Sequence, residues 1–71
     1  MLRKKDLINN KYFTKWEDCV YYCSSDFDYV IVFESNGPVL RTFCEVNGVG
    51  DIVKDLTSLE DLNETIEYLN I

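Results

Sequence analysis

The stretch that most constrains this chain is residues 28–46, DYVIVFESNGPVLRTFCEV. Two runs rich in β-branched and aromatic residues, 29–34 and 39–46, flank the tetrapeptide Ser-Asn-Gly-Pro. Asparagine and glycine accept the positive φ of a tight turn, and Asn-Gly between apolar runs is the strongest short-range signal for a β-hairpin. We therefore predict a hairpin here, with Asn36 and Gly37 as its two-residue turn.

Both faces of this hairpin are apolar. Because side chains alternate across a strand, one face is expected to carry Tyr29, Ile31, Phe33, Leu40, Thr42 and Cys44, and to meet the core. The other face is too apolar for an ordinary solvated face of an antiparallel sheet. We interpret it as a protein interface or, alternatively, as a face that the first helix covers. Its candidate interface residues are Val30, Val32, Val39, Arg41 and Phe43.

The residues after the hairpin predict a third strand and a terminal helix. Asn47-Gly48 is a second turn signal, after which residues 51–56 would return as a strand, with a bulge that sets Arg41 near Asp55. A capping-box pattern at Thr57, with a second cap at Ser58, begins a helix over residues 57–71. Its apolar stripe is Leu59, Leu62, Ile66 and Leu69, and its acidic face is Glu60, Asp61, Glu64 and Glu67.

Residues 12–25, YFTKWEDCVYYCSS, carry two conflicting patterns. Thr14-x-x-Glu17 matches a capping box, and an apolar stripe at i, i+3, i+4 and i+7 is formed by Trp16, Cys19, Val20 and Cys23. Against a helix, aromatic and β-branched residues fit strands better. The cap and the two acids of the first turn favour the helix, so we expect a helix over residues 12–25.

Together these elements predict an α+β fold in two layers. A small antiparallel β-meander of two to three strands would be covered by a helix from the N-terminal half and by a C-terminal helix, in the order α-β-β-(β)-α. Residues 1–11 would form either a short helix or a flexible basic arm. A chain of 71 residues is too short for two cores, so residues 1–71 are expected to be a single domain.

Charge is distributed unevenly along the chain. Residues 1–15 carry five cations and one acid, a net charge of +4, whereas residues 16–71 carry two cations and twelve acids, a net charge of −10. Nucleic-acid binding is disfavoured, because neutralising phosphates supplies most of its affinity. The acidic balance favours basic partners, and the basic head can attract the acidic body within one chain or between two.

The sequence lacks the residues that most catalytic and metal sites need. There is no histidine, hence no base for a nucleophilic triad, and three scattered cysteines cannot supply the four ligands of a structural zinc site. We expect no catalytic, cofactor or metal-binding residues and no enzyme activity. With no signal peptide and no membrane span, the chain is expected in the cytoplasm, with its cysteines as thiols.

The function that fits these observations is protein–protein interaction by a small, acidic, non-enzymatic protein. Its partner would be another protein, or a second copy in a homodimer. The alternative is an acidic nucleic-acid mimic that inhibits a DNA- or RNA-binding protein, of the kind that mobile elements and phages encode. This mimic would use the acidic face of Glu60, Asp61, Glu64 and Glu67. A structural module without a partner is the third hypothesis.

Overall fold

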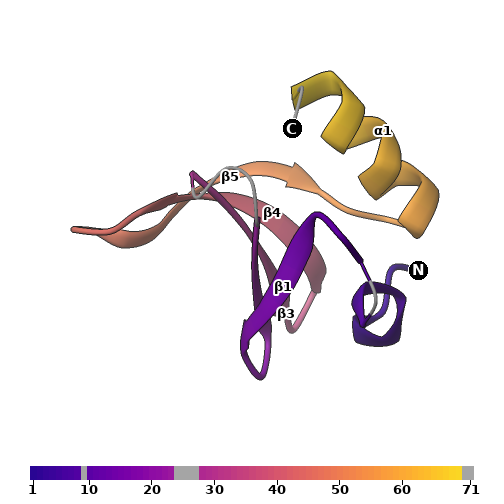
Figure 1. The fold of residues 1–71 in the computed structure, drawn as a ribbon, viewed down its shortest axis with the longest axis horizontal. Helices are drawn as coiled ribbons and strands as arrows, with labels where there is room; N and C mark the ends of the chain where they lie inside the picture. The colour runs from indigo at the N-terminus through magenta and orange to yellow at the C-terminus, as the bar shows by residue number, and fades with distance from the viewer. Residues whose placement is uncertain (9, 24–27, 70–71) are drawn as a thin grey trace.

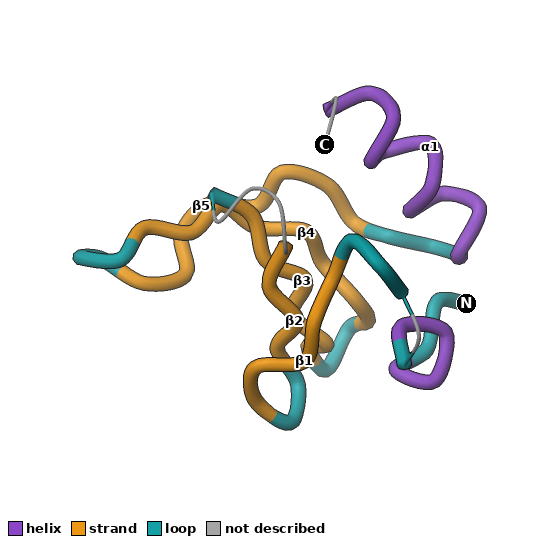
Figure 2. The backbone as a smooth tube through the Cα atoms, in the orientation of Figure 1, coloured by secondary structure: helices purple, strands orange, loops and turns teal. Residues whose placement is uncertain are grey.

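The structure, a computed structural model, describes residues 1–8, 10–23 and 28–69. These residues form a 3₁₀-helix, five strands and an α-helix (Figures 1 and 2). In chain order they are η1 (Lys4–Leu7), β1 (Phe13–Glu17), β2 (Val20–Cys23), β3 (Tyr29–Glu34), β4 (Gly37–Cys44), β5 (Gly48–Asp55) and α1 (Leu59–Leu69). The strands pair as an antiparallel meander in the order β1-β2-β3-β4-β5.

The helix predicted over residues 12–25 is wrong. Its described part is the hairpin β1–β2, in which Phe13 lies opposite Cys23 and Lys15 lies opposite Tyr21. Strand preference of the aromatic and β-branched residues prevails over the capping pattern. The expected two-layer α+β fold with the order α-β-β-(β)-α is therefore replaced by a five-stranded meander in the described residues, followed by one C-terminal helix.

The central hairpin β3–β4 turns one residue earlier than predicted. Glu34 lies opposite Gly37, which leaves Ser35 and Asn36 as the loop. Gly37 has a φ of +120°, a conformation that favours glycine. The register differs from the expected one by two residues, so that Phe33 lies opposite Pro38 instead of Leu40. A shift of two residues leaves every side chain on its predicted face, whereas a shift of one would exchange the faces.

The hairpin β4–β5 contains irregular pairing that bends it. The register shifts on both sides of Arg41, so that Arg41 lies directly opposite Ile52, whereas Asp55 lies opposite Val39. Gly48, at the end of the turn, has a φ of +75°, which suits glycine after a three-residue loop. The tip of this hairpin, residues 45–47, projects away from the rest of the molecule (Figures 1 and 2).

The core lies on one face of the sheet, under η1 and α1. Ile31 and Leu40, both expected on this face, are buried there, while Tyr29 and Phe33 pack against its edge. The backbone amide of Leu2 donates to the carbonyl of Thr57 over 3.1 Å, and this bond ties the N-terminus to the segment before α1. The buried cluster consists of Leu2, Leu7, Phe13, Tyr21, Cys23, Ile31, Leu40, Leu56, Leu62 and Ile66.

Helix α1 begins at the second of the two predicted caps. The amide of Asp61 donates to Ser58 Oγ over 3.0 Å, which satisfies one of the free amides of the first turn. The helix buries Leu62, Thr65 and Ile66, and an ion pair of 2.9 Å between Lys54 Nζ and Asp61 Oδ1 joins it to β5. Within the described residues no helix is long and apolar enough to cross a membrane.

Candidate functional site

The sheet face opposite the core is organised by a bulge in β1. Lys15 lies opposite Tyr21 and Glu17 opposite Val20, so Trp16 is the extra residue. A bulge redirects a side chain, and here the indole meets the ring of Phe43 edge to face, with 5.5 Å between the ring centres. Since β1 and β4 are not neighbours, the sheet must curl for these rings to meet over β2 and β3. We call the side opposite the core, which carries Trp16 and Phe43, the second sheet face.

The five candidate interface residues all lie on the second sheet face, but at different depths. Val30 lies opposite Arg41, and Val32 lies opposite Val39. Val30 and Val39 are buried within the chain, whereas Val32, Arg41 and Phe43 are half-buried. The first two therefore support the sheet, and only the other three present surface to a partner.

The most exposed apolar groups of this face are ones that the sequence did not indicate. Trp16 is 52% exposed, Val49 44% and Ile52 56%. Val49 lies opposite Phe43 and Ile52 opposite Arg41, which continues the face onto the edge strand β5. The helix predicted over residues 12–25 did not place Trp16 on this face, and the register predicted for the third strand did not place Ile52 there.

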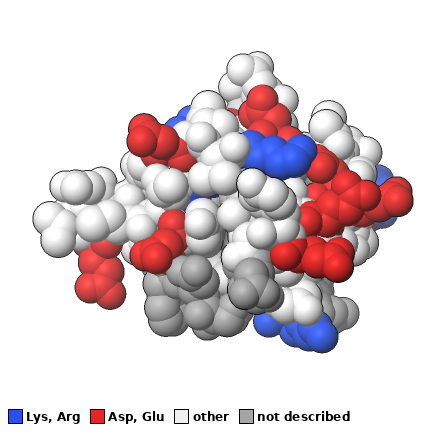
Figure 3. Space-filling model, turned by 90° about the horizontal axis from the view of Figure 1, so that it is seen from above, with Lys and Arg blue, Asp and Glu red and all other residues white. Residues whose placement is uncertain are grey.

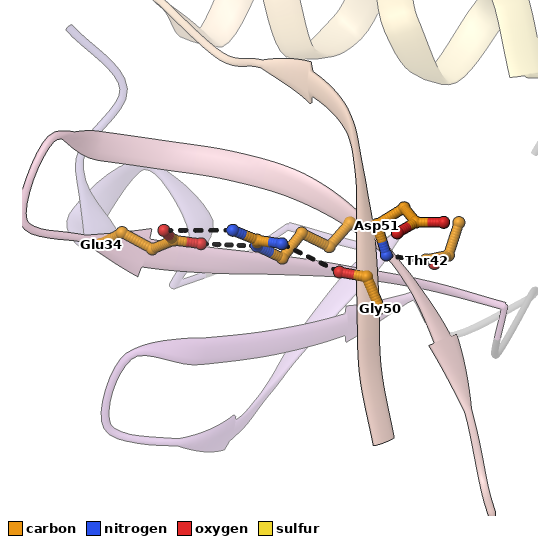
Figure 4. A network of polar contacts seen from close by, with 5 residues as sticks. Glu34, Thr42, Gly50 and Asp51 are labelled. Atoms are coloured by element: carbon orange, nitrogen blue, oxygen red, sulfur yellow. Dashed lines mark hydrogen bonds and ion pairs between the residues drawn. The ribbon is translucent and has the colours of Figure 1, made fainter. Parts of the chain in front are cut away.

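An ion pair at the centre of the face fixes three strands to one another (Figure 4). Arg41 on β4 contacts Glu34 on β3 twice: Nε donates to Oε2 over 2.6 Å and Nη2 to Oε1 over 3.3 Å. Arg41 Nη1 also donates to the carbonyl of Gly50 on β5 over 2.9 Å. The hydrogen bond from Arg41 lowers the pKa of the Glu34 carboxyl. The two opposite charges at the centre of the second sheet face therefore neutralise each other.

A second side-chain bond holds the irregular part of β4–β5. The amide of Asp51 donates to Thr42 Oγ1 over 2.9 Å (Figure 4). The hydroxyl takes the place of a ladder acceptor where the register shifts. Gly50 passes so close that an added Cβ would lie 2.6 Å from the same Oγ1. Glycine is thus favoured here by a close approach rather than by its φ.

The rim of the second sheet face is acidic. Glu17 lies opposite Val20, Glu45 lies beside the Trp16–Phe43 ring pair, and Asp55 lies beside Ile52. All three are exposed, and none of them is in an ion pair with another described residue. Because Arg41 is held by Glu34, the face presents apolar groups inside a negative border.

The predicted acidic face of α1 presents fewer free carboxylates than expected. Glu60, Glu64 and Glu67 are exposed, and acidic groups gather on the side of the molecule where α1 lies (Figure 3). Asp61, however, contacts Lys54 and accepts hydrogen bonds from the amide and hydroxyl of Thr57, at 3.0 and 3.2 Å. These contacts, that of Lys54 foremost, lower the pKa of Asp61. Asp61 therefore stabilises the junction of β5 and α1.

Comparisons with known protein families, with curated proteins and with solved structures find no match to this chain. The structure thus supplies the fold alone: a five-stranded antiparallel meander followed by a C-terminal helix, which packs with η1 against the core side of the sheet. Among the described residues, no cluster of three or more histidine, cysteine or acidic side chains is arranged to hold a metal ion. The cysteines 19, 23 and 44 form no disulfide with one another.

Proposed function

We propose that this protein binds another protein through the second sheet face, as a binding protein rather than an enzyme. The observation that carries the proposal is the gathering of Trp16, Val49 and Ile52, all about half exposed, on one face of a small sheet. Contiguous exposed apolar patches mark contacts between proteins, and tryptophan is enriched where such contacts are strongest.

The acidic rim indicates the chemistry of the partner. Glu17, Glu45 and Asp55 surround the apolar groups, and complementary charge at a rim guides association and excludes wrong partners. A second copy of this chain would bring two acidic rims together. The partner we propose is therefore a different protein, with an apolar surface bordered by lysine and arginine.

The nucleic-acid mimic is less well supported by the geometry. Asp61 belongs to the junction with Lys54 and Thr57, which leaves Glu60, Glu64 and Glu67 as the exposed acids of that predicted face. The cytoplasm remains part of our proposal. Its support is the exposed free thiol of Cys44, which suits a reducing compartment.

The experiment compares capture by two matched variants. The double variant Trp16→Ser, Ile52→Ser removes the two most exposed apolar groups of the face, and Tyr68→Ser removes a still more exposed ring on α1. Each purified protein is crosslinked in a lysate of its own cells, and bound proteins are identified by mass spectrometry. We expect a basic protein that wild type and Tyr68→Ser retain and the double variant loses, and whose retention weakens with added salt.

Two results would overturn the proposal. Equal capture by all three proteins would place the binding surface elsewhere. A dimer of the chain itself, lost only in the double variant, would assign the face to a second copy.

A further inference from the structure

A small hollow at one end of the second sheet face combines aromatic walls with a carboxylate. It measures about 270 Å³ and is lined, among the described residues, by Trp16, Tyr22, Phe43 and Glu45. The rings of Trp16 and Phe43 stand at 89° to each other, so they form two walls of a corner. Tyr22 comes from β2, between the strands that carry the other two rings.

These walls favour a cation over a neutral or anionic group. The face of an aromatic ring carries negative potential and attracts an ammonium within about 6 Å of the ring centre. Glu45 adds a formal negative charge at the same hollow, and no described lysine or arginine lines it. The chain already contains one such contact, since Lys11 Nζ lies 5.1 Å from the ring centre of Tyr12. An alkylammonium group is thus the ligand whose positive charge suits both the aromatic rings and the carboxylate of the hollow.

We infer that this hollow receives the side-chain ammonium of a lysine on the partner protein. The inference rests on the proposed function and gives the second sheet face a defined specificity element. Lysine fits better than arginine because its ammonium is compact and enters a corner of perpendicular rings, whereas a planar guanidinium prefers to stack flat on a single ring. The aliphatic stem of the lysine would lie along the apolar surface beside the hollow.

The test uses Trp16 as its own reporter, because it is the only tryptophan in the chain. Tryptophan emission is followed while N-acetyl-lysine methylamide is added, and in parallel while the norleucine and arginine analogues are added. Norleucine keeps the aliphatic chain but lacks the ammonium. We expect a saturable change with lysine and binding about 2- to 30-fold weaker with norleucine, the range of exposed to desolvated cation–π contacts.

Two variants identify the groups responsible. Glu45→Gln changes an exposed side chain and should reduce the preference for lysine over norleucine, and Phe43→Leu should reduce it while keeping an apolar wall. Tyr68→Leu, on a ring of α1 that does not line the hollow, should leave the preference unchanged. Circular dichroism checks that each variant is folded. If Phe43→Leu does not fold, the effect of Glu45→Gln on the preference for lysine over norleucine is the test.

Three outcomes would overturn the inference: no response of Trp16 to lysine, equal binding of lysine and norleucine, or tighter binding of arginine. The proposed function is judged separately, by capture with the variant Trp16→Ser, Ile52→Ser. If that capture depends on the face while the lysine probe shows no preference, the face binds a protein and the hollow is only an apolar part of it.

Discussion

Gly50→Ala tests the close packing between β4 and β5, because the sign of its expected effect on stability depends on whether the Thr42 hydroxyl is present. An alanine Cβ would lie 2.6 Å from Thr42 Oγ1, so the hydroxyl must move and release the amide of Asp51. The lost hydrogen bond and the local strain together destabilise by about 1–3 kcal/mol. Alanine also restricts the unfolded chain, which stabilises by about 0.4–1 kcal/mol. We expect a net loss of about 0.5–2 kcal/mol.

The same substitution should behave differently when the hydroxyl is absent. In a Thr42→Ala background the nearest remaining atoms lie 3.7 and 3.8 Å from the new Cβ, which is ordinary contact. Thr42→Ala alone should destabilise by about 1 kcal/mol through the lost hydrogen bond. Adding Gly50→Ala should then be neutral or stabilise by about 0.4–1 kcal/mol.

The assay is urea unfolding of the four proteins, followed by far-UV circular dichroism, with thermal unfolding as a second readout. One kcal/mol corresponds to about 4–8 °C for a domain of this size. Gly48→Ala serves as the control, because its φ of +75° should make it lose about 1–2 kcal/mol in both backgrounds. Equal destabilisation by Gly50→Ala with and without Thr42 would contradict a steric role of the Thr42 hydroxyl.

Three further predictions concern the junction of α1, the core and the thiols. Because Lys54, foremost, and Thr57 lower the pKa of Asp61, its contribution is present above about pH 4 and is lost as the pH falls through the folded pKa. Asp61→Asn should therefore be less stable than wild type in urea at pH 7, and the difference should shrink as the pH falls below about 4. Leu62→Ala, at a fully buried site, should lower the free energy of unfolding by about 2–5 kcal/mol, whereas the partly exposed Leu59→Ala should change it much less. Since the three cysteines form no disulfide with one another, a reducing agent should leave the thermal midpoint unchanged, and a lower midpoint would reveal a disulfide.

The alternation of side chains between the two sheet faces was predictable from the sequence, whereas the register of the paired strands was not. The alternation in 29–34 and 39–46 placed Val30, Val32, Val39 and Phe43 on one face, and the two-residue difference in register did not alter that. Gly37 has a φ of +120°, and it pairs with Glu34 as the first residue of β4 instead of serving as the second loop residue. Asn-Gly alone does not distinguish these arrangements.

The N-terminal half was mispredicted because a local pattern competed with a non-local one. Thr14-x-x-Glu17 satisfies the spacing of a helix cap, yet Thr14 lies opposite Tyr22 across a strand pair. The bulge that turns Trp16 toward Phe43 depends on contacts between β1 and β4, which no local window contains. The sequence therefore did not predict the aromatic hollow, because its residues come together only through these non-local contacts.

The solution mass of the wild-type chain shows whether the second sheet face is open for a different protein. Light scattering is recorded over a wide range of concentration, alongside the variant Trp16→Ser, Ile52→Ser. We expect the monomer mass of 8.3 kDa at every concentration for both proteins. A stable species of twice that mass, formed by the wild type and abolished in the variant, would contradict it.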